Sequence, residues 1–326
     1  MRYRKLGRTG WTVSEIGLGT YPLSGATFTK GDYWEGPNAY GHVSATEARA
    51  TILLGLELGL NFIDTAPVYG QAETVIGEAL GGKREGVIVE TKAGEYQTPD
   101  DILARDFSEA QIRRSVAESK RRLRVDTIDI LLLHSPTREE YGVGEPLDTI
   151  SRLRDEGDVR FIGVSVGGGA QEAIELIRSG RVDVLQVGFN LLQPQMAAEA
   201  FSLAQAEGVG IVVRVPLASG FLTGRIGEDH VFAADDYRSK MSREAIVRGA
   251  RRAKAFEFLV RDGVATTLPE AALRYILSFD AVSTVIAGAM NRKELEQNQA
   301  VSDKGPLPPS ALEEIRAVQQ QQSAGK

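Results

Sequence analysis

The feature that most constrains the fold is a regular alternation of strand-like and helix-like segments along the 326-residue chain. Short apolar runs rich in β-branched residues predict strands, and they fall at residues 15–19, 61–65, 87–92, 128–134, 159–165, 184–188, 210–214 and 283–287. Segments with helical periodicity lie between them at residues 48–58, 73–80, 112–123, 147–156, 170–178, 196–207, 243–261, 269–278 and 292–300, and a last helix is predicted at 310–322. Eight β/α units without a linker-like change of composition predict one (β/α)8 TIM barrel domain over residues 1–326.

A doubly wound sheet is the alternative for such an alternation. It would need a glycine fingerprint after the first strand, and the segment Gly17-Leu18-Gly19-Thr20-Tyr21-Pro22 lacks the third glycine. The run Gly167-Gly168-Gly169 lacks the Lys-Ser/Thr of a nucleotide P-loop and is interpreted as a strand-to-helix turn. The barrel is therefore the favoured prediction.

The ends and gaps of the pattern add further elements. The first residues predict a β-hairpin, with strands at 2–6 and 11–18 and a turn at 7–10. Ser44 and Ser108 stand where helix N-caps are expected, and Gln111 gives the second a capping-box spacing. The long irregular segments 22–42 and 216–237 are predicted to be lids or binding loops at the C-terminal face.

Composition excludes several classes of function. With no cysteine, the chain has no disulfide, thiol nucleophile or thiolate metal site. The net charge of −6 argues against nucleic-acid and anionic-membrane partners. No segment has a signal-peptide pattern or the roughly 20 apolar residues of a membrane span, so a cytoplasmic protein is predicted. The three histidines, His42, His134 and His230, show no metal-ligand spacing, so no metal is expected.

Four polar residues follow three successive strand-like runs. Asp64, Lys92 and His134 end their runs, and Tyr69 lies five residues beyond Asp64. Each residue alone has an ordinary structural explanation, such as a helix cap or a surface position. Parallel strands, however, would bring all four to one rim of the barrel, where such folds place their chemistry. The combination therefore predicts an active site.

The four side chains suit proton transfer to a carbonyl oxygen. A tyrosine has an ordinary pKa near 10, and a neighbouring ammonium favours its phenolate form. Lowering the pKa of Tyr69 by about two units would need roughly 2.7 kcal/mol from Lys92. Asp64 would supply the counter-charge of Lys92, and His134 would polarise or orient the substrate oxygen.

Blocks around these residues identify a family. They are Gly17-Leu18-Gly19-Thr20, Asp64-Thr65-Ala66-Pro67-Val68-Tyr69-Gly70 with Glu73 and Gly77, Lys92, Leu132-Leu133-His134-Ser135-Pro136, Gly163-Val164-Ser165, the block from Gln186 to Leu192, and the block from Pro216 to Gly224. The chain resembles the aldo-keto reductase superfamily almost from end to end. The block from Asp64 to Gly77, with a downstream lysine and histidine, is the most specific part of this resemblance.

The resemblance implies a reaction and a set of site residues. Asp64, Tyr69, Lys92 and His134 would form the catalytic tetrad, and Tyr69 would donate a proton as hydride passes from nicotinamide to the carbonyl carbon. The cofactor would lie over the barrel mouth, with Ser165 and Gln186 on the carboxamide, Phe189 stacked on the nicotinamide, and the loop 217–224 over the pyrophosphate. The expected cofactor-binding residues are Thr20, Tyr21, Asp64, Ser165, Gln186, Phe189, Pro216, Leu217, Ala218, Gly220, Leu222, Gly288, Met290, Glu294, Gln297 and Asn298.

Two departures from the family pattern concern the cofactor. Val166 stands where an asparagine is common, which removes one expected carboxamide hydrogen bond. The family expectation is NADP, but Met290 stands where many relatives carry an arginine that would pair with a 2′-phosphate. Glu294 would repel that phosphate and accept from a ribose hydroxyl. NADP and NAD both stay open.

The predicted function is NAD(P)-dependent oxidoreduction of a small-molecule aldehyde, ketone or sugar. The alternative is a cofactor-binding, redox-sensing regulatory subunit with slow turnover, like the potassium-channel β subunits that share the fold. A sugar-specific ketoreductase is a third possibility, because the segment 22–42 carries residues suited to a polyhydroxylated substrate. These are Phe28, Tyr33, Trp34, Asn38, Tyr40 and His42. No sequence feature indicates an oligomeric state.

Overall fold

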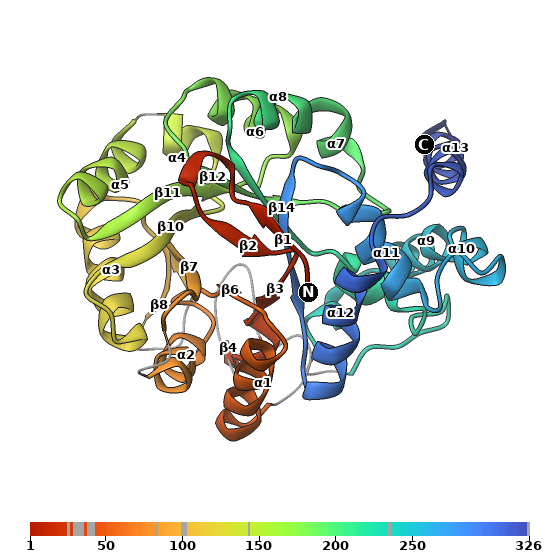
Figure 1. Cartoon of the computed structure of the whole chain (residues 1–326), viewed down its shortest axis with the longest axis horizontal. Coiled ribbons are helices and arrows are strands. Elements are labelled where there is room, and N and C mark those ends of the chain that lie inside the picture. The colour runs from red at the N-terminus through yellow and green to blue at the C-terminus, as the bar shows by residue number, and fades with distance from the viewer. Residues whose placement is uncertain are drawn as a thin grey trace.

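Eight parallel strands form a closed barrel in the computed structural model (Figure 1). The structure describes residues 1–24, 27–28, 36–37, 43–81, 84–98, 103–142, 144–233 and 236–324. The barrel strands are β3 (Ile16–Gly19), β6 (Phe62–Asp64), β7 (Ile88–Ala93), β10 (Ile128–His134), β11 (Val159–Ser165), β12 (Val184–Gly188), β13 (Gly210–Arg214) and β14 (Val282–Gly288). They neighbour one another in chain order, and β14 closes the barrel on β3. The predicted (β/α)8 barrel is confirmed.

Helices surround the strands (Figure 1). They are α1 (Ala45–Glu57), α2 (Ala72–Leu80), α3 (Glu109–Leu123), α4 (Arg138–Gly142), α5 (Glu145–Asp155), α6 (Ala170–Arg178), α7 (Gln195–Glu199), α8 (Phe201–Ala206), α9 (Arg243–Lys254), α10 (Phe258–Arg261), α11 (Leu268–Leu277), α12 (Arg292–Lys304) and α13 (Pro309–Ala324). Ser44 and Ser108 cap α1 and α3 as predicted, accepting from the backbone N–H groups of Glu47 and Gln111. The side chain of Gln111 instead donates to Ser115, so the second capping box is only half formed.

Two predicted helices are interrupted. The segment 196–207 divides into α7 and α8 at Ala200, and the segment 243–261 divides into α9 and α10 around Phe256. Ala200 and Phe256 are both buried.

The N-terminal hairpin, formed by β1 (Tyr3–Lys5) and β2 (Thr12–Ser14), pairs antiparallel and crosses one end of the barrel (Figure 1). The backbone N–H of Arg8 donates to Gly208 O at 2.6 Å, and Leu6 is fully buried against the barrel interior. The second strand ends earlier than predicted. Buried Glu15 accepts from Arg2 and Arg4 at 3.1 and 2.7 Å, and β3 begins only after it.

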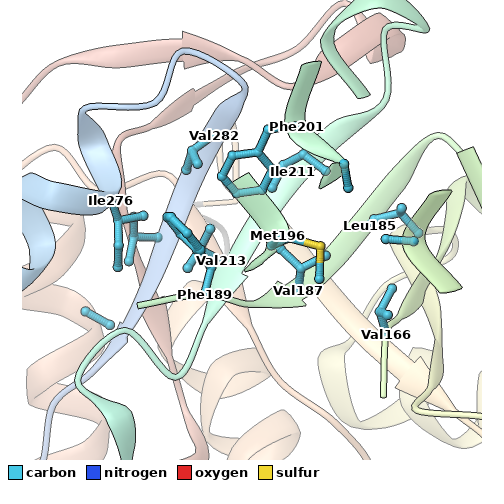
Figure 2. Packing of buried hydrophobic residues seen from close by; sticks show 14 of the residues in the cluster. Val166, Leu185, Val187, Phe189, Met196, Phe201, Ile211, Val213, Ile276 and Val282 are labelled. Atoms are coloured by element: carbon cyan, nitrogen blue, oxygen red, sulfur yellow. The ribbon is translucent and has the colours of Figure 1, made fainter. Parts of the chain in front are cut away.

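The barrel interior changes from apolar to polar along its axis. Every second side chain of a strand points inward, so Phe62 is followed by Asp64, Val184 by Gln186 and Val212 by Arg214. The apolar members pack with Leu6 of the hairpin, whereas the polar members line a cavity at the carboxyl ends of the strands. Outward-facing side chains such as Leu185, Val187 and Ile211 pack in the layer between strands and helices (Figure 2).

Two small hairpins extend the carboxyl-end loops. The hairpin of β8 (Glu95–Gln97) and β9 (Leu103–Arg105) was not predicted and follows β7 directly. Within the segment 22–42, β4 (Thr27–Phe28) pairs with β5 (Gly36–Pro37). Most of that segment lies outside the described residues, including Tyr33, Trp34, Asn38, Tyr40 and His42, as does the side chain of Phe28. In the described part of the chain, no helix is both long and apolar enough to cross a bilayer.

Candidate active site

Lys92 and Asp64 form a buried ion pair at the carboxyl ends of β6 and β7. Lys92 Nζ donates to Asp64 Oδ1 and, at 2.8 Å, to Thr65 O, and the Lys92 side chain is fully buried. Burial is the largest single influence and would lower the pKa of Lys92, but the charge and hydrogen bond of Asp64, together with Tyr69 and Glu90, outweigh it and leave that pKa raised. Lys92 is therefore a fixed ammonium at neutral pH.

Tyr69 lies directly against this ammonium. Its hydroxyl is 3.5 Å from Lys92 Nζ, and the Nζ atom lies 4.9 Å from the ring centroid. Burial nevertheless raises the pKa of Tyr69, and the attraction of Lys92 only partly offsets it, while Asp64 adds to the increase. The predicted net lowering of this pKa was wrong, because sequence reasoning counted the ammonium and omitted desolvation. Tyr69 thus carries its proton at neutral pH, as a proton donor must.

His134 approaches Tyr69 from the end of β10. The two rings lie edge to face with their centroids 6.0 Å apart. Burial lowers the pKa of His134 well below its ordinary value, and the charges of Lys92 and Arg214 act in the same direction. The imidazole is neutral at pH 7. The four predicted catalytic residues therefore converge on one rim, with three in direct contact and the histidine beside them.

Behind the tetrad, Gln186 joins two buried carboxyl groups. Its Nε2 donates to Asp64 Oδ1 at 2.7 Å and to Glu90 Oε1 at 2.6 Å, and its Oε1 accepts from Ser165 Oγ at 3.2 Å. Both amide hydrogens are thus committed inside the barrel, which leaves only Oε1 for the predicted carboxamide contact. Glu90 is a site residue that sequence reasoning missed. Its place two residues before Lys92, on the same inward face of β7, was the available signal.

A cavity of about 1510 Å³ opens at this rim. Asp64, Tyr69 and His134 line it, together with the predicted cofactor-binding residues Tyr21, Ser165, Gln186, Pro216, Leu217, Gly220, Gly288, Met290, Glu294, Gln297 and Asn298. Lys92, Thr20, Ala218 and Leu222 lie outside the lining. Lys92 is directly below it, and Thr20 Oγ1 donates to Asp64 O at 2.8 Å.

Phe189 occupies a different place from the one predicted. It is fully buried, with ring centroids 4.9 Å from Phe201, 5.4 Å from Tyr275 and 5.1 Å from Phe279. Figure 2 shows it among Val213, Ile276 and other apolar side chains behind the strands. The prediction that it stacks on the nicotinamide is therefore corrected, because its ring is committed to the hydrophobic core.

Arg214, at the end of β13, lines the cavity instead and was also missed. Its Nη2 donates to Val166 O at 2.9 Å, and its guanidinium stands about 4 Å from where a side chain on Gly188 would begin. Burial lowers the pKa of Arg214 from its ordinary value, which lies far above neutrality, so the group remains charged. Lys92 and Arg214 are thus two of the cations at the rim, and they favour an anionic oxygen nearby.

The segment after β13 is a tight turn built mainly from left-handed residues. Val215, Ala218, Ser219 and Gly220 all have positive φ, and the N–H groups of Ala218 and Gly220 donate within the turn to Val215 O and Leu217 O. Gly220 has a φ of 94°, a conformation that other residues rarely adopt, so a substitution at this position would be strained. Arg238 Nη1 donates to Ser219 O at 2.8 Å, and the rest of its guanidinium is paired with Asp236, from Nη2 to Oδ2 at 2.6 Å. Leu217, Ser219 and Gly220 line the cavity, whose volume suits a dinucleotide cofactor.

At the far end of the cavity, Asn291 and Glu294 cap α12. Asn291 Oδ1 accepts from Glu294 N and Glu294 Oε2 accepts from Met290 N, both at 3.0 Å. Asn298 Nδ2 donates to Gly288 O at 3.1 Å. The only cation within 4 Å of Glu294 among the described residues is Arg225, 3.8 Å from Oε1. The carboxylate of Glu294 therefore faces the cavity in a fixed position.

Comparison with known proteins agrees with this geometry. The model of the "Aldo/keto reductase family" matches residues 15–320. An NADH-specific methylglyoxal reductase of Escherichia coli is 30% identical, covering 92% of this chain and 93% of that protein. An L-galactose dehydrogenase of Arabidopsis thaliana is also 30% identical, over 91% and 86% of the two chains. The holo form of aldo-keto reductase AKR11C1 from Bacillus halodurans superposes with a TM-score of 0.77 at 29% identity, covering 98% of this chain and 96% of that chain. The chain belongs to the aldo/keto reductase family.

Proposed function

We propose that Asp64, Tyr69, Lys92 and His134 carry out the reaction of this NAD(P)-dependent oxidoreductase of carbonyl and alcohol groups. The observation that carries the assignment is the contact of a protonated tyrosine with a buried, carboxylate-held ammonium at the wall of the cavity. A nicotinamide cofactor supplies or accepts the hydride when bound. The residues of the chain supply the proton and the electrostatic environment.

In carbonyl reduction, Tyr69 gives its hydroxyl proton to the oxygen that gains negative charge. Lys92, 3.5 Å from that hydroxyl, stabilises the phenolate that remains. Asp64 and Thr65 O hold the ammonium in place, so little reorganisation accompanies the transfer. Neutral His134 beside Tyr69 can donate a hydrogen bond to the same oxygen and orient the carbonyl.

The cofactor preference that the geometry favours is NAD(H). Glu294 faces the cavity, is held by Met290 N, and would repel a 2′-phosphate while accepting from a ribose hydroxyl. Met290 has no charge with which to bind that phosphate. The nearby cation Arg225 is already paired with Glu294. One relative named as NADH-specific supports the same choice.

The Glu294→Gln variant tests this preference. Glutamine retains an oxygen for the bond from Met290 N and removes only the charge, so we expect the Kd for NADPH to fall about three- to tenfold, with little change for NADH. Glu296→Gln is the matched control, since Glu296 is exposed on the same helix and does not line the cavity. If the wild-type protein binds NADPH more tightly than NADH, this proposal is wrong.

The substrate class that fits the cavity is a small hydroxylated aldehyde, ketone or sugar. The wall next to His134 and Tyr69 is rich in polar side chains, namely Glu95, Arg105, Thr137, Arg138, Gln171, Glu172 and Glu175. Such groups lose hydrogen bonds when they meet a hydrocarbon chain and regain them on hydroxyl groups. A steady-state comparison of hydroxy-aldehydes and aldoses with unsubstituted aldehydes of equal length tests this. Higher kcat/KM on the unsubstituted series would contradict it.

A further inference from the structure

Glu95 stands on the unpredicted β8 strand, with its carboxyl group against the buried nitrogen of His134. Its Oε2 lies 3.3 Å from His134 Nδ1, and both residues line the cavity. The alignment of the two atoms falls short of a good hydrogen bond, and Nδ1 has no other partner among the described residues. Such contacts commonly tighten when a ligand binds. Because Nδ1 is buried, Nε2 is the nitrogen that a ligand can reach.

We infer that Glu95 is a positioning residue that sets the tautomer of His134, and through it the direction of the reaction that the site favours. This inference rests on the proposed role of His134. When Glu95 is protonated, its hydroxyl donates to Nδ1, and Nε2 carries the hydrogen. When Glu95 is ionised, it accepts from Nδ1–H, and Nε2 presents a lone pair. One proton leaves the pair in passing from the first state to the second.

The two states suit opposite directions of the reaction. Nε2–H donates a hydrogen bond to a carbonyl oxygen and favours its reduction. A bare Nε2 accepts a hydrogen bond from an alcohol hydroxyl and favours oxidation. A charged imidazolium is disfavoured here, because the pKa of His134 is lowered well below its ordinary value. If the shared proton moved from Glu95 to Nδ1, Nε2 would still carry its hydrogen. Nε2 would therefore still donate a hydrogen bond to the substrate oxygen.

The groups around Glu95 place the ionisation of its carboxyl group, and with it the tautomer change of His134, near neutral pH. Burial raises the pKa of Glu95 to about 7, and the carboxylate of Glu140 on α4 acts in the same direction. Three cations oppose it, namely Arg105 on β9, which lies 3.8 Å from Glu95 Oε1, Lys92 on β7 and Arg214 on β13. The same three cations face His134, whose other neighbour in the site is Tyr69. The groups come from separate loops and strands and meet only at this rim.

Nitrogen NMR on histidine-labelled protein tests the inference without any activity measurement. The chain has only three histidines, so the His134 signals are readily assigned with a His134→Asn variant. We expect Nε2 to carry hydrogen below a midpoint near pH 7 and Nδ1 to carry it above, in line with the raised pKa of Glu95. In Glu95→Gln this change should be absent between about pH 6 and pH 8, with unchanged His230 signals as the check on folding.

Glu140→Gln is the matched control. Glu140 accepts from Arg105 Nη2 at 3.1 Å and does not line the cavity. Removing its charge should keep the tautomer change and move its midpoint to lower pH, because Glu140 raises the pKa of Glu95. One tautomer at every pH in the wild-type protein, or the same midpoint in Glu95→Gln, overturns the inference.

Kinetics give the second readout. The wild-type kcat/KM for carbonyl reduction should fall about tenfold from pH 6 to pH 8, and that for alcohol oxidation should rise. In the Glu95→Gln variant, kcat/KM in both directions should no longer change with pH in this range. A tautomer change in a protein that does not reduce carbonyls would reject the proposed function alone, whereas activity without the tautomer change would reject the inference alone.

Discussion

Replacing Glu90 with glutamine should stabilise the protein at neutral pH. Glu90 is fully buried on β7, and its neighbours are the carboxylate of Asp64 and the amide of Gln186. Burial raises the pKa of Glu90 well above its ordinary value, and the charge of Asp64 raises it further. Glu90 therefore stays protonated and can donate to Asp64. A glutamine amide keeps that shape and donor without an ionisable group.

The sign and size of the effect follow from proton linkage. The unfolded chain releases the Glu90 proton near pH 4.5, whereas the folded protein retains it to a higher pH. Below pH 4.5 the wild-type protein has the full stabilising contribution of protonated Glu90. Above pH 4.5 its free energy of unfolding falls by about 1.4 kcal/mol per pH unit, until the pH reaches the raised pKa of Glu90 in the folded protein. Between pH 5 and pH 7 the advantage of the Glu90→Gln variant over the wild type should therefore grow, by at most about 1.4 kcal/mol per pH unit. At roughly 2.1 cal/mol/K of unfolding entropy per residue, each such unit is at most about 2 °C in Tm for a chain of 326 residues.

Thermal unfolding of both proteins at pH 5, 6 and 7 measures this difference. Glu73→Gln is the matched control, because Glu73 is equally buried but pairs with Arg122 Nε at 2.6 Å and accepts from Thr91 Oγ1 at 2.6 Å. Breaking that buried pair should lower stability by about 3–5 kcal/mol, the opposite sign. If the Tm gain of Glu90→Gln fails to grow from pH 5 to pH 7, or if the variant is less stable at pH 7, the assignment of a protonated Glu90 is refuted.

Two further changes test the site and the barrel. Tyr69→Phe should lower kcat/KM for carbonyl reduction by about 10²- to 10⁴-fold while leaving the nicotinamide Kd, measured by fluorescence titration, almost unchanged; full activity would show that another group donates the proton. Gly163→Ala should destabilise the protein by at least about 1–3 kcal/mol in denaturant unfolding, because the new Cβ would lie 1.9 Å from Val184 O and 2.8 Å from Leu132 Cδ2. Gly142→Ala, with no atom within 4 Å of the added Cβ, should stay within about 0.5 kcal/mol of the wild type, and equal losses in both variants would contradict the packing argument.

The sequence alone determined the barrel and the rim that carries the polar residues. The apolar run of β10 and the last four residues of β11 are buried on nearly every side, so they stand out from the helices without any knowledge of their partners. Parallel order then brings Asp64, Lys92 and His134 to one end, whatever the details of packing. The hairpin of β8 and β9 escaped prediction because its residues are only half buried and leave no periodic pattern.

The tertiary structure decided what each polar group can do. The raised pKa values of Tyr69 and Glu90 come from burial by strands distant in sequence, a cost that no local motif records. Whether Phe189 faced the cavity or the core depended on which aromatic rings lay behind its strand. Strand order follows from patterns that neighbouring residues impose on the chain, whereas protonation and side-chain direction follow from the sum of all groups around an atom. The sequence therefore placed the four polar residues at one rim, and only the folded barrel set the protonation of Tyr69, Lys92 and His134.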